Sequence, residues 1–146
     1  AGPHMAGIIT ADRRLTAEAL CERLQGMCLL VLGTVTADGR PLVGPVDGYW
    51  IHGAWHFSSG RNSVRMRHIA RRPAVSATHL PRDEFSVTVH GRAALFDMND
   101  PAEPDLRQAM LDYYLPRQGP SFEDWLDAEN PIGGRIAADK LFVFAL

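Results

Sequence analysis

The sequence predicts a mainly β domain with flanking helices, in which antiparallel strands close into a small barrel. The chain has 146 residues, of which 46% are hydrophobic and 22% charged, the size and balance of one globular domain with a buried core. Short β-type segments follow one another through tight turns, which favours antiparallel pairing. One helical segment is inserted after the third strand, and closure into a barrel would remove the exposed sheet edges.

The N-terminal residues are set aside before the fold is considered. Residues 1–5 are interpreted as a cloning scar with the start methionine, and residues 6–146 as a single domain. No apolar stretch reaches the length of a membrane span, because the run from Met27 to Val35 is only as long as a strand. A signal-peptide pattern is not found, so we expect a cytoplasmic protein without a membrane partner.

The first elements are a helix and a β-hairpin. Residues 15–24 place apolar side chains on one helical face, and Thr16 suits the start of that helix. The β-type run from Leu29 to Thr36 ends at residues 37–40. The Asp-Gly pair in this turn supplies the positive backbone angles that a tight hairpin needs.

The return strand and the next strand complete a meander. The return strand, residues 41–51, contains Pro45, which cannot donate to a strand ladder. We therefore expect Pro45 at an edge, at a bulge, or where a ligand takes the space. His52 and Gly53 turn the chain into a third strand over residues 54–58.

A short basic helix follows over residues 61–72. Asn62 and Ser63 are its N-cap candidates, and Pro73 ends it.

The second half of the chain mixes strands and helices. Small apolar residues predict a strand over residues 74–80, and strict alternation predicts another over residues 85–96. Two helices are expected over residues 101–114 and 122–126, and a final strand over residues 140–146. Of the aromatic residues in the helical region, Tyr113, Tyr114 and Trp125 either line a pocket or pack against the barrel, and packing is expected for each.

Charge is distributed unevenly along the chain. The net charge of −2 and the pI near 6.3 argue against nucleic acid or an anionic membrane as partner of the whole chain. Between Asp47 and Asp83, however, six arginines occur without any acid, whereas Asp97 to Glu129 holds nine acids against two arginines. Either an anion docks on the basic segment or the two segments neutralise each other. The six arginines are Arg61, Arg65, Arg67, Arg71, Arg72 and Arg82.

Residues 58–65, with the sequence Ser-Ser-Gly-Arg-Asn-Ser-Val-Arg, run from a strand end into a helix start and suit a phosphate. Helix N-termini present free N–H groups and a favourable dipole, and Arg offers bidentate hydrogen bonds to phosphate oxygens. Arg61 and Arg65 are one turn apart and can flank one anion. The alternative is an N-capped surface helix whose arginines pair with the acidic tail. Neither a Walker loop nor a GxGxxG motif is present.

Five segments, taken in their order and spacing, cover most of residues 25–96. They are TVTADGRP at residues 34–41, Pro45-Val46, WHFSSG at 55–60, SVRMRHIARRPAVS at 63–76 and Gly91-Arg92-Ala93. Together they resemble a known family, the pyridoxamine 5'-phosphate oxidase-like split barrels, and more narrowly its flavin and deazaflavin oxidoreductases.

The resemblance implies a six-stranded antiparallel split β-barrel that works as a homodimer and binds flavin mononucleotide (FMN) or coenzyme F-420 in a groove between the subunits. It implies that the segment around residues 59–65 holds the cofactor phosphate and that residues 45–47 lie along the ring system. The candidate cofactor-binding residues are Pro45, Val46, Asp47, Ser58, Ser59, Gly60, Arg61, Ser63, Val64 and Arg65.

Two departures from the family pattern qualify this expectation. Arg65 stands where a lysine is more usual, which keeps the charge but changes the geometry. The Arg and Lys pair of the true pyridoxamine phosphate oxidases is absent from residues 42–47, so oxidation of vitamin B6 is not expected.

The expected function is an oxidoreductase that transfers a hydride between a flavin or deazaflavin and a small organic substrate. The cofactor carries the chemistry, and no catalytic residue or metal site is expected. Coenzyme F-420 is favoured over FMN because the Arg-rich composition suggests an actinobacterial source. Nucleic acid ranks last, since no aromatic residues are interleaved with the arginines of residues 59–73.

Two alternatives come from other classes of protein. One is a non-catalytic flavin, haem or tetrapyrrole-binding protein of the same fold. The other is a cofactor-free interaction module with Tyr49, Trp50 and Trp55 as its contact surface, although core positions are the simpler explanation for these aromatics. The candidates for a haem axial ligand are His52, His56, His68, His79 and His90, without the HxH or HExxH spacing of a metal site.

Overall fold

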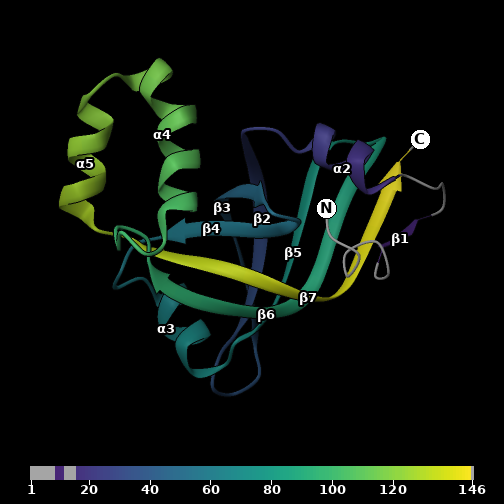
Figure 1. Cartoon of the computed structure of the whole chain (residues 1–146). Helices are drawn as coiled ribbons and strands as arrows, with labels where there is room; N and C mark the ends of the chain where they lie inside the picture. Colours follow the sequence, from purple (N-terminus) through teal and green to yellow (C-terminus); the bar gives the residue numbers. More distant parts are fainter. Residues whose placement is uncertain (1–8, 12–15, 146) are drawn as a thin grey trace.

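A barrel of six antiparallel strands forms the centre of the computed structural model, which describes residues 9–11 and 16–145 (Figure 1). The strands are ordered β7-β4-β3-β2-β5-β6, and β6 pairs with β7 to close the ring. The mainly β fold class and the closed six-stranded barrel predicted from the sequence are therefore confirmed. The elements are β1 (Ile9–Ala11), α2 (Ala17–Arg23), β2 (Met27–Val35), β3 (Pro41–Ile51), β4 (Ala54–Ser59), α3 (Val64–Arg71), β5 (Ala74–Arg82), β6 (Phe85–Asp97), α4 (Pro104–Gln118), α5 (Ser121–Glu129) and β7 (Ile132–Ala145).

Local signals in the sequence account for the ends of several elements. The Thr16 hydroxyl accepts a hydrogen bond from the Ala19 N–H at 3.0 Å and caps α2, and Ser63 caps α3 in the same way. Gly39 has a φ of 84° in the turn between β2 and β3, as the Asp-Gly prediction requires. The interpretation of residues 1–5 lies outside the described residues, as does residue 15 of the first predicted helix.

Two strands differ from the prediction. The short β1 was not predicted, and it pairs in parallel with β7 at an edge of the sheet. β7 begins at Ile132, although its strand was predicted only from residue 140. The reason is packing, because the Phe96 and Phe57 rings occupy the space next to Gly133 and Gly134, where a Cβ would approach to 2.6 and 2.3 Å. Glycine is uncommon in strands, so a strand whose glycines are required by tertiary packing is not recognised from its sequence pattern.

We expect the substitution Gly134→Ala to lower the free energy of unfolding by about 1–3 kcal/mol, the range for overpacking a core. The added methyl group must displace the Phe57 ring, which is fully buried. Urea denaturation of the purified protein measures the change. Gly33→Ala is the matched control, because its Cβ would meet no atom nearer than 3.4 Å. Equal losses in the two variants would contradict this account of β7.

The barrel opens between β3 and β4. Their ladder joins Gly48 to Phe57 and continues to Ile51, so residues 45–47 have no partner in β4. On its other side β3 remains paired with β2, where Pro45 lies opposite Val31. Pro45 is therefore paired on one side only, which makes its position a local edge of the sheet, one of the positions expected for a residue that cannot donate to a ladder.

Helices cover the two ends of the barrel. In Figure 1, α4 and α5 lie together at one end and α2 lies at the other. A large apolar cluster fills the barrel, and a smaller one joins α4 and α5 to Tyr49 of β3. Tyr49 and Trp55 are buried, as expected of core aromatics. Within residues 9–11 and 16–145, no helix is long and apolar enough to cross a membrane.

Candidate functional site

A pocket of about 270 Å³ lies at the split between β3 and β4. We call it the split pocket. Seven of the ten predicted site residues line it, because the unpaired part of β3 faces the end of β4 and the start of the following turn. The lining residues are Pro45, Val46, Asp47, Ser58, Ser59, Gly60, Arg65, Met110, Trp125, Glu129 and Pro131.

Arg65 provides the positive charge of the split pocket. Its guanidinium donates to the Ser59 hydroxyl at 3.2 Å and to the Pro45 carbonyl at 3.3 Å. A Cβ on Gly44 would lie 2.6 Å from the Arg65 Nη2, so this glycine leaves the space for the side chain. Burial lowers the pKa of Arg65, and the guanidinium remains charged. No carboxylate of the described residues lies within ion-pair distance of Arg65.

Ser63 and Val64 lie beside the split pocket and do not line it. The Ser63 hydroxyl accepts from the Met66 N–H at 3.2 Å and caps α3. It also lies 3.3 Å from the Ser59 hydroxyl, so Ser63 supports a residue of the lining. Val64 is half exposed at the first position of α3.

Arg61 does not line the split pocket. It forms an ion pair with Asp97 and donates from Nε to the Asn130 carbonyl at 3.0 Å. Its side chain lines a separate hollow between α3 and the end of β6. α3 begins at Val64, so Arg61 precedes the helix instead of standing one helical turn before Arg65, and of the two arginines only Arg65 lines the split pocket. For Arg61, pairing with the acidic segment is the interpretation that the structure favours.

Asp47 connects the barrel to helices α4 and α5, which we call the helical hairpin. Its carboxylate accepts a hydrogen bond from the Tyr114 hydroxyl of α4. Burial and the Asp47 carboxylate both raise the pKa of Tyr114, which keeps the phenol protonated. Tyr114 also stacks on Phe122 of α5, with ring centroids 4.6 Å apart. The packing expected for Tyr113 and Tyr114 is thus observed, since these two rings also meet edge to face.

Trp125 does not follow the packing prediction. Half of its surface is exposed, and it lines the split pocket. Sequence reasoning also missed Met110, Glu129 and Pro131, which come from α4, α5 and the start of the connection to β7. They lie more than 40 residues beyond Arg65 in the sequence, and no local pattern marks them as pocket residues.

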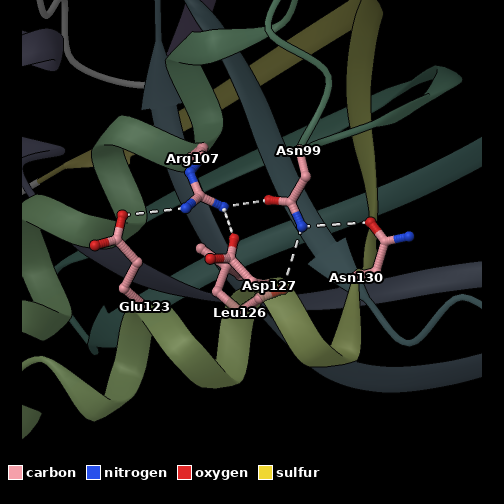
Figure 2. A network of polar contacts seen from close by, with 6 residues as sticks. All are labelled: Asn99, Arg107, Glu123, Leu126, Asp127 and Asn130. Atoms are coloured by element: carbon pink, nitrogen blue, oxygen red, sulfur yellow. Dashed lines mark hydrogen bonds and ion pairs between the residues drawn. The ribbon is translucent and has the colours of Figure 1, made fainter.

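A polar network holds α5 in place (Figure 2). Arg107 of α4, largely buried, forms ion pairs with Glu123 at 3.1 Å and Asp127 at 2.9 Å. It also donates to the Asn99 side chain, whose amide donates to the Leu126 carbonyl at 3.1 Å. Because one partly buried guanidinium bonds to Asn99 and to two residues of α5, it links α5 to α4 and to the loop that precedes α4.

None of the five candidate axial histidines lines the split pocket. His56 is buried, with Nδ1 donating to the Ala54 carbonyl and Nε2 accepting from Arg135 at 3.2 Å. The His79 ring bonds to the Leu29 carbonyl. These two rings are therefore engaged in structural contacts.

Burial lowers the pKa of His56, and this predicts a pH-dependent stability. Below a pH of about 6.5 the unfolded chain binds a proton that folded His56 does not, so stability is lost as the pH falls towards the folded pKa. We expect the midpoint of thermal unfolding to decrease between pH values of about 7.5 and 5.5. The decrease should be smaller in His56→Gln, whatever its stability at neutral pH. Parallel curves for the two proteins would contradict this role of His56.

Comparison with known proteins finds similar proteins only through structure. No family model matches the sequence, and no curated protein matches it. A conserved hypothetical protein from Mycobacterium tuberculosis has a TM-score of 0.73 and 18% identity, over 92% of this chain and 87% of that one. An F420 reductase has a TM-score of 0.63 and 21% identity, over 81% of this chain and 91% of that one. HutZ, the haem storage protein from Vibrio cholerae, has a TM-score of 0.69 and 18% identity, over 91% and 98%.

These likenesses establish the fold. The chain has a split β-barrel fold, as its sequence resemblance implied, and shares it with these proteins and with a putative pyridoxamine 5'-phosphate oxidase from Listeria innocua. Proteins that share this fold include a reductase and haem-binding proteins. The fold alone therefore does not determine the function, which has to be inferred from the residues of the site.

Proposed function

We propose that the protein is an oxidoreductase that binds a flavin or deazaflavin cofactor in the split pocket and acts on a small organic substrate. The observation that carries the proposal is the charge at the split, where Arg65 has no carboxylate partner among the described residues. A partly buried guanidinium without a counterion favours an anionic ligand. The sequence resemblance and the F420 reductase of the same fold support a cofactor phosphate as that ligand.

The residues present fit such a phosphate. Arg65 has five N–H donors and uses two of its nitrogens on Ser59 and Pro45. Ser58, Ser59 and Gly60 line the same pocket, and the Ser59 hydroxyl beside Arg65 adds a neutral hydrogen-bonding group. Arg65 and the serines would hold the phosphate, and residues 45–47 would lie along the ring system.

A bound flavin or deazaflavin supplies hydride transfer. The chain then has to bind and orient the cofactor and to exclude water. Deazaflavin is the preferred cofactor and FMN the next, in line with the sequence resemblance and the structural likeness to an F420 reductase.

We also propose that the protein works as a homodimer. Leu29, Val31 and Val43 are 52%, 40% and 71% exposed on the outer face of β2 and β3. Pro45 and Asp47 lie opposite Val31 and Leu29 in the strand register, and both line the split pocket. A second copy covering this apolar face would also form a wall of the pocket, as in the groove that the resemblance implies.

Side-by-side titration of the purified protein with coenzyme F-420, FMN and hemin tests the proposed function. Cofactor fluorescence reports the first two ligands, and the haem absorption band reports the third. Selective binding of the deazaflavin supports a reductase, and preference for FMN indicates a flavin oxidase or reductase. Binding of hemin alone, or of none of the three, overturns the proposal.

A further inference from the structure

The helical hairpin of α4 and α5 gives the split pocket a wall of its own chemical character. Met110, Trp125 and Glu129 lie on this side, and Arg65 on the barrel side. The barrel side offers a cation and hydroxyls, whereas the hairpin side offers an indole, a thioether and a carboxylate. A ligand that contacts both walls must therefore carry different groups at its two ends, or two ligands must share the pocket.

Trp125 is the last ring of an aromatic row. Tyr114 stacks on Phe122 with an interplanar angle of 21°, and Phe122 meets Trp125 at 5.6 Å and 31°. The indole is 50% exposed, and it lines the pocket. A flat, conjugated molecule placed against its exposed part would continue the row and remove apolar surface from water.

Glu129 lies one helical turn after Trp125, so both side chains are on the same face of α5. Glu129 is exposed and lines the pocket, and its carboxylate has no ion-pair partner among the described residues. Such a carboxylate favours a protonated nitrogen over a second anion. The two residues thus offer a stacking surface and a negative charge within reach of one small molecule.

The position of this wall is fixed before any ligand binds. Arg107 joins Glu123 and Asp127 of α5 to α4, and these two acids flank Trp125 in sequence (Figure 2). Preorganised side chains lose little entropy on binding, so the wall can discriminate between substrates. Arg107 acts here as a positioning residue.

We propose that Trp125 and Glu129 select the substrate, and that the substrate is a planar aromatic molecule carrying a protonated nitrogen. The ring stacks on the indole, and the nitrogen faces the Glu129 carboxylate. This inference rests on the proposed function, since it assigns the barrel side of the pocket to the cofactor and the hairpin side to the substrate.

Two planar probes of opposite charge test the inference by calorimetry at neutral pH, 4-aminoquinoline, which is protonated on its ring nitrogen, as the cation and quinoline-2-carboxylate as the anion. We expect the protein, with saturating cofactor, to bind the cation about tenfold more tightly than the anion. Glu129→Gln should reduce this preference to about twofold, and Trp125→Leu should weaken both probes about fivefold or more, with Trp125→Phe retaining most of the affinity. Asp124→Asn removes the same charge from α5 outside the pocket lining and should leave the preference intact.

Equal binding of the two probes, or the same loss in Asp124→Asn as in Glu129→Gln, would overturn the inference. Absence of probe binding to the wild-type protein would do so as well. The titrations are repeated without cofactor to separate this inference from the proposed function. A protein that binds neither F-420 nor FMN but keeps the Trp125-dependent preference for the cation refutes the oxidoreductase and leaves the selective wall in place.

Discussion

Substitution of Arg65 by alanine is expected to weaken cofactor binding by about tenfold to 150-fold, which corresponds to the 1.5–3 kcal/mol of hydrogen bonds to charged groups. Arg65 is the only cation in the lining of the split pocket described by the structure, and its bonds to Ser59 and Pro45 aim the guanidinium at the position proposed for the phosphate. The dissociation constant of F-420 or FMN, whichever binds to the wild-type protein, measures the loss by fluorescence titration.

Three further variants distinguish a phosphate contact from a general effect of charge. Arg67→Ala removes a charge from the same helix but outside the split pocket, and it should change the affinity less than about twofold. Arg61→Ala should also have a small effect, because Arg61 pairs with Asp97. Arg65→Lys keeps the charge without the planar fork and should lie in between. A folded Arg65→Ala variant with wild-type affinity would refute the phosphate assignment.

The barrel side of the site could be predicted from the sequence because its signals are local. A hairpin turn, a proline in a strand and a capped helix start are each contained in a few residues, and the structure brings Pro45 and Ser59 to one pocket. The register of β3 and β4 then decides which of these residues have no strand partner. The helix was predicted to begin at residue 61, but α3 begins three residues later, at Val64. Arg61 therefore lies before the helix, and its side chain pairs with Asp97.

The hairpin side could not be predicted, because long-range contacts determine it. α4 and α5 are held by the network of Arg107 and by packing on Tyr49, a residue some 60 positions earlier in the chain. An exposed Trp125 and a buried one have the same local sequence, and only the placement of α5 exposes the indole to the pocket. β7 was predicted only over its last residues for a related reason. Packing against neighbouring aromatic rings requires Gly133 and Gly134, and glycines do not give the sequence pattern of a strand.

Placing a charge on the apolar face of β2 and β3 should both dissociate the dimer and weaken cofactor binding. Val31 is 40% exposed in the single chain, and it lies between Pro45 of β3 and Thr78 of β5. In a symmetric dimer Val31→Glu buries an unpaired carboxylate twice, at a cost of about 3 kcal/mol or more per copy. We therefore expect a monomer in sedimentation velocity at concentrations where the wild-type protein is dimeric, and about tenfold weaker cofactor binding.

Loss of the dimer and weaker cofactor binding are expected together, because the second copy is proposed to form a wall of the pocket. Because Val31 is already partly in water in the single chain, the variant should still unfold cooperatively, although its unfolding midpoint loses the contribution of the dimer. Leu115→Glu on α4 controls for an added charge at another exposed apolar position. A monomeric Val31→Glu that binds cofactor as the wild type does would show that one chain forms the whole site. A dimer that persists would place the interface on another face and leave Leu29, Val31 and Val43 without the partner proposed for them.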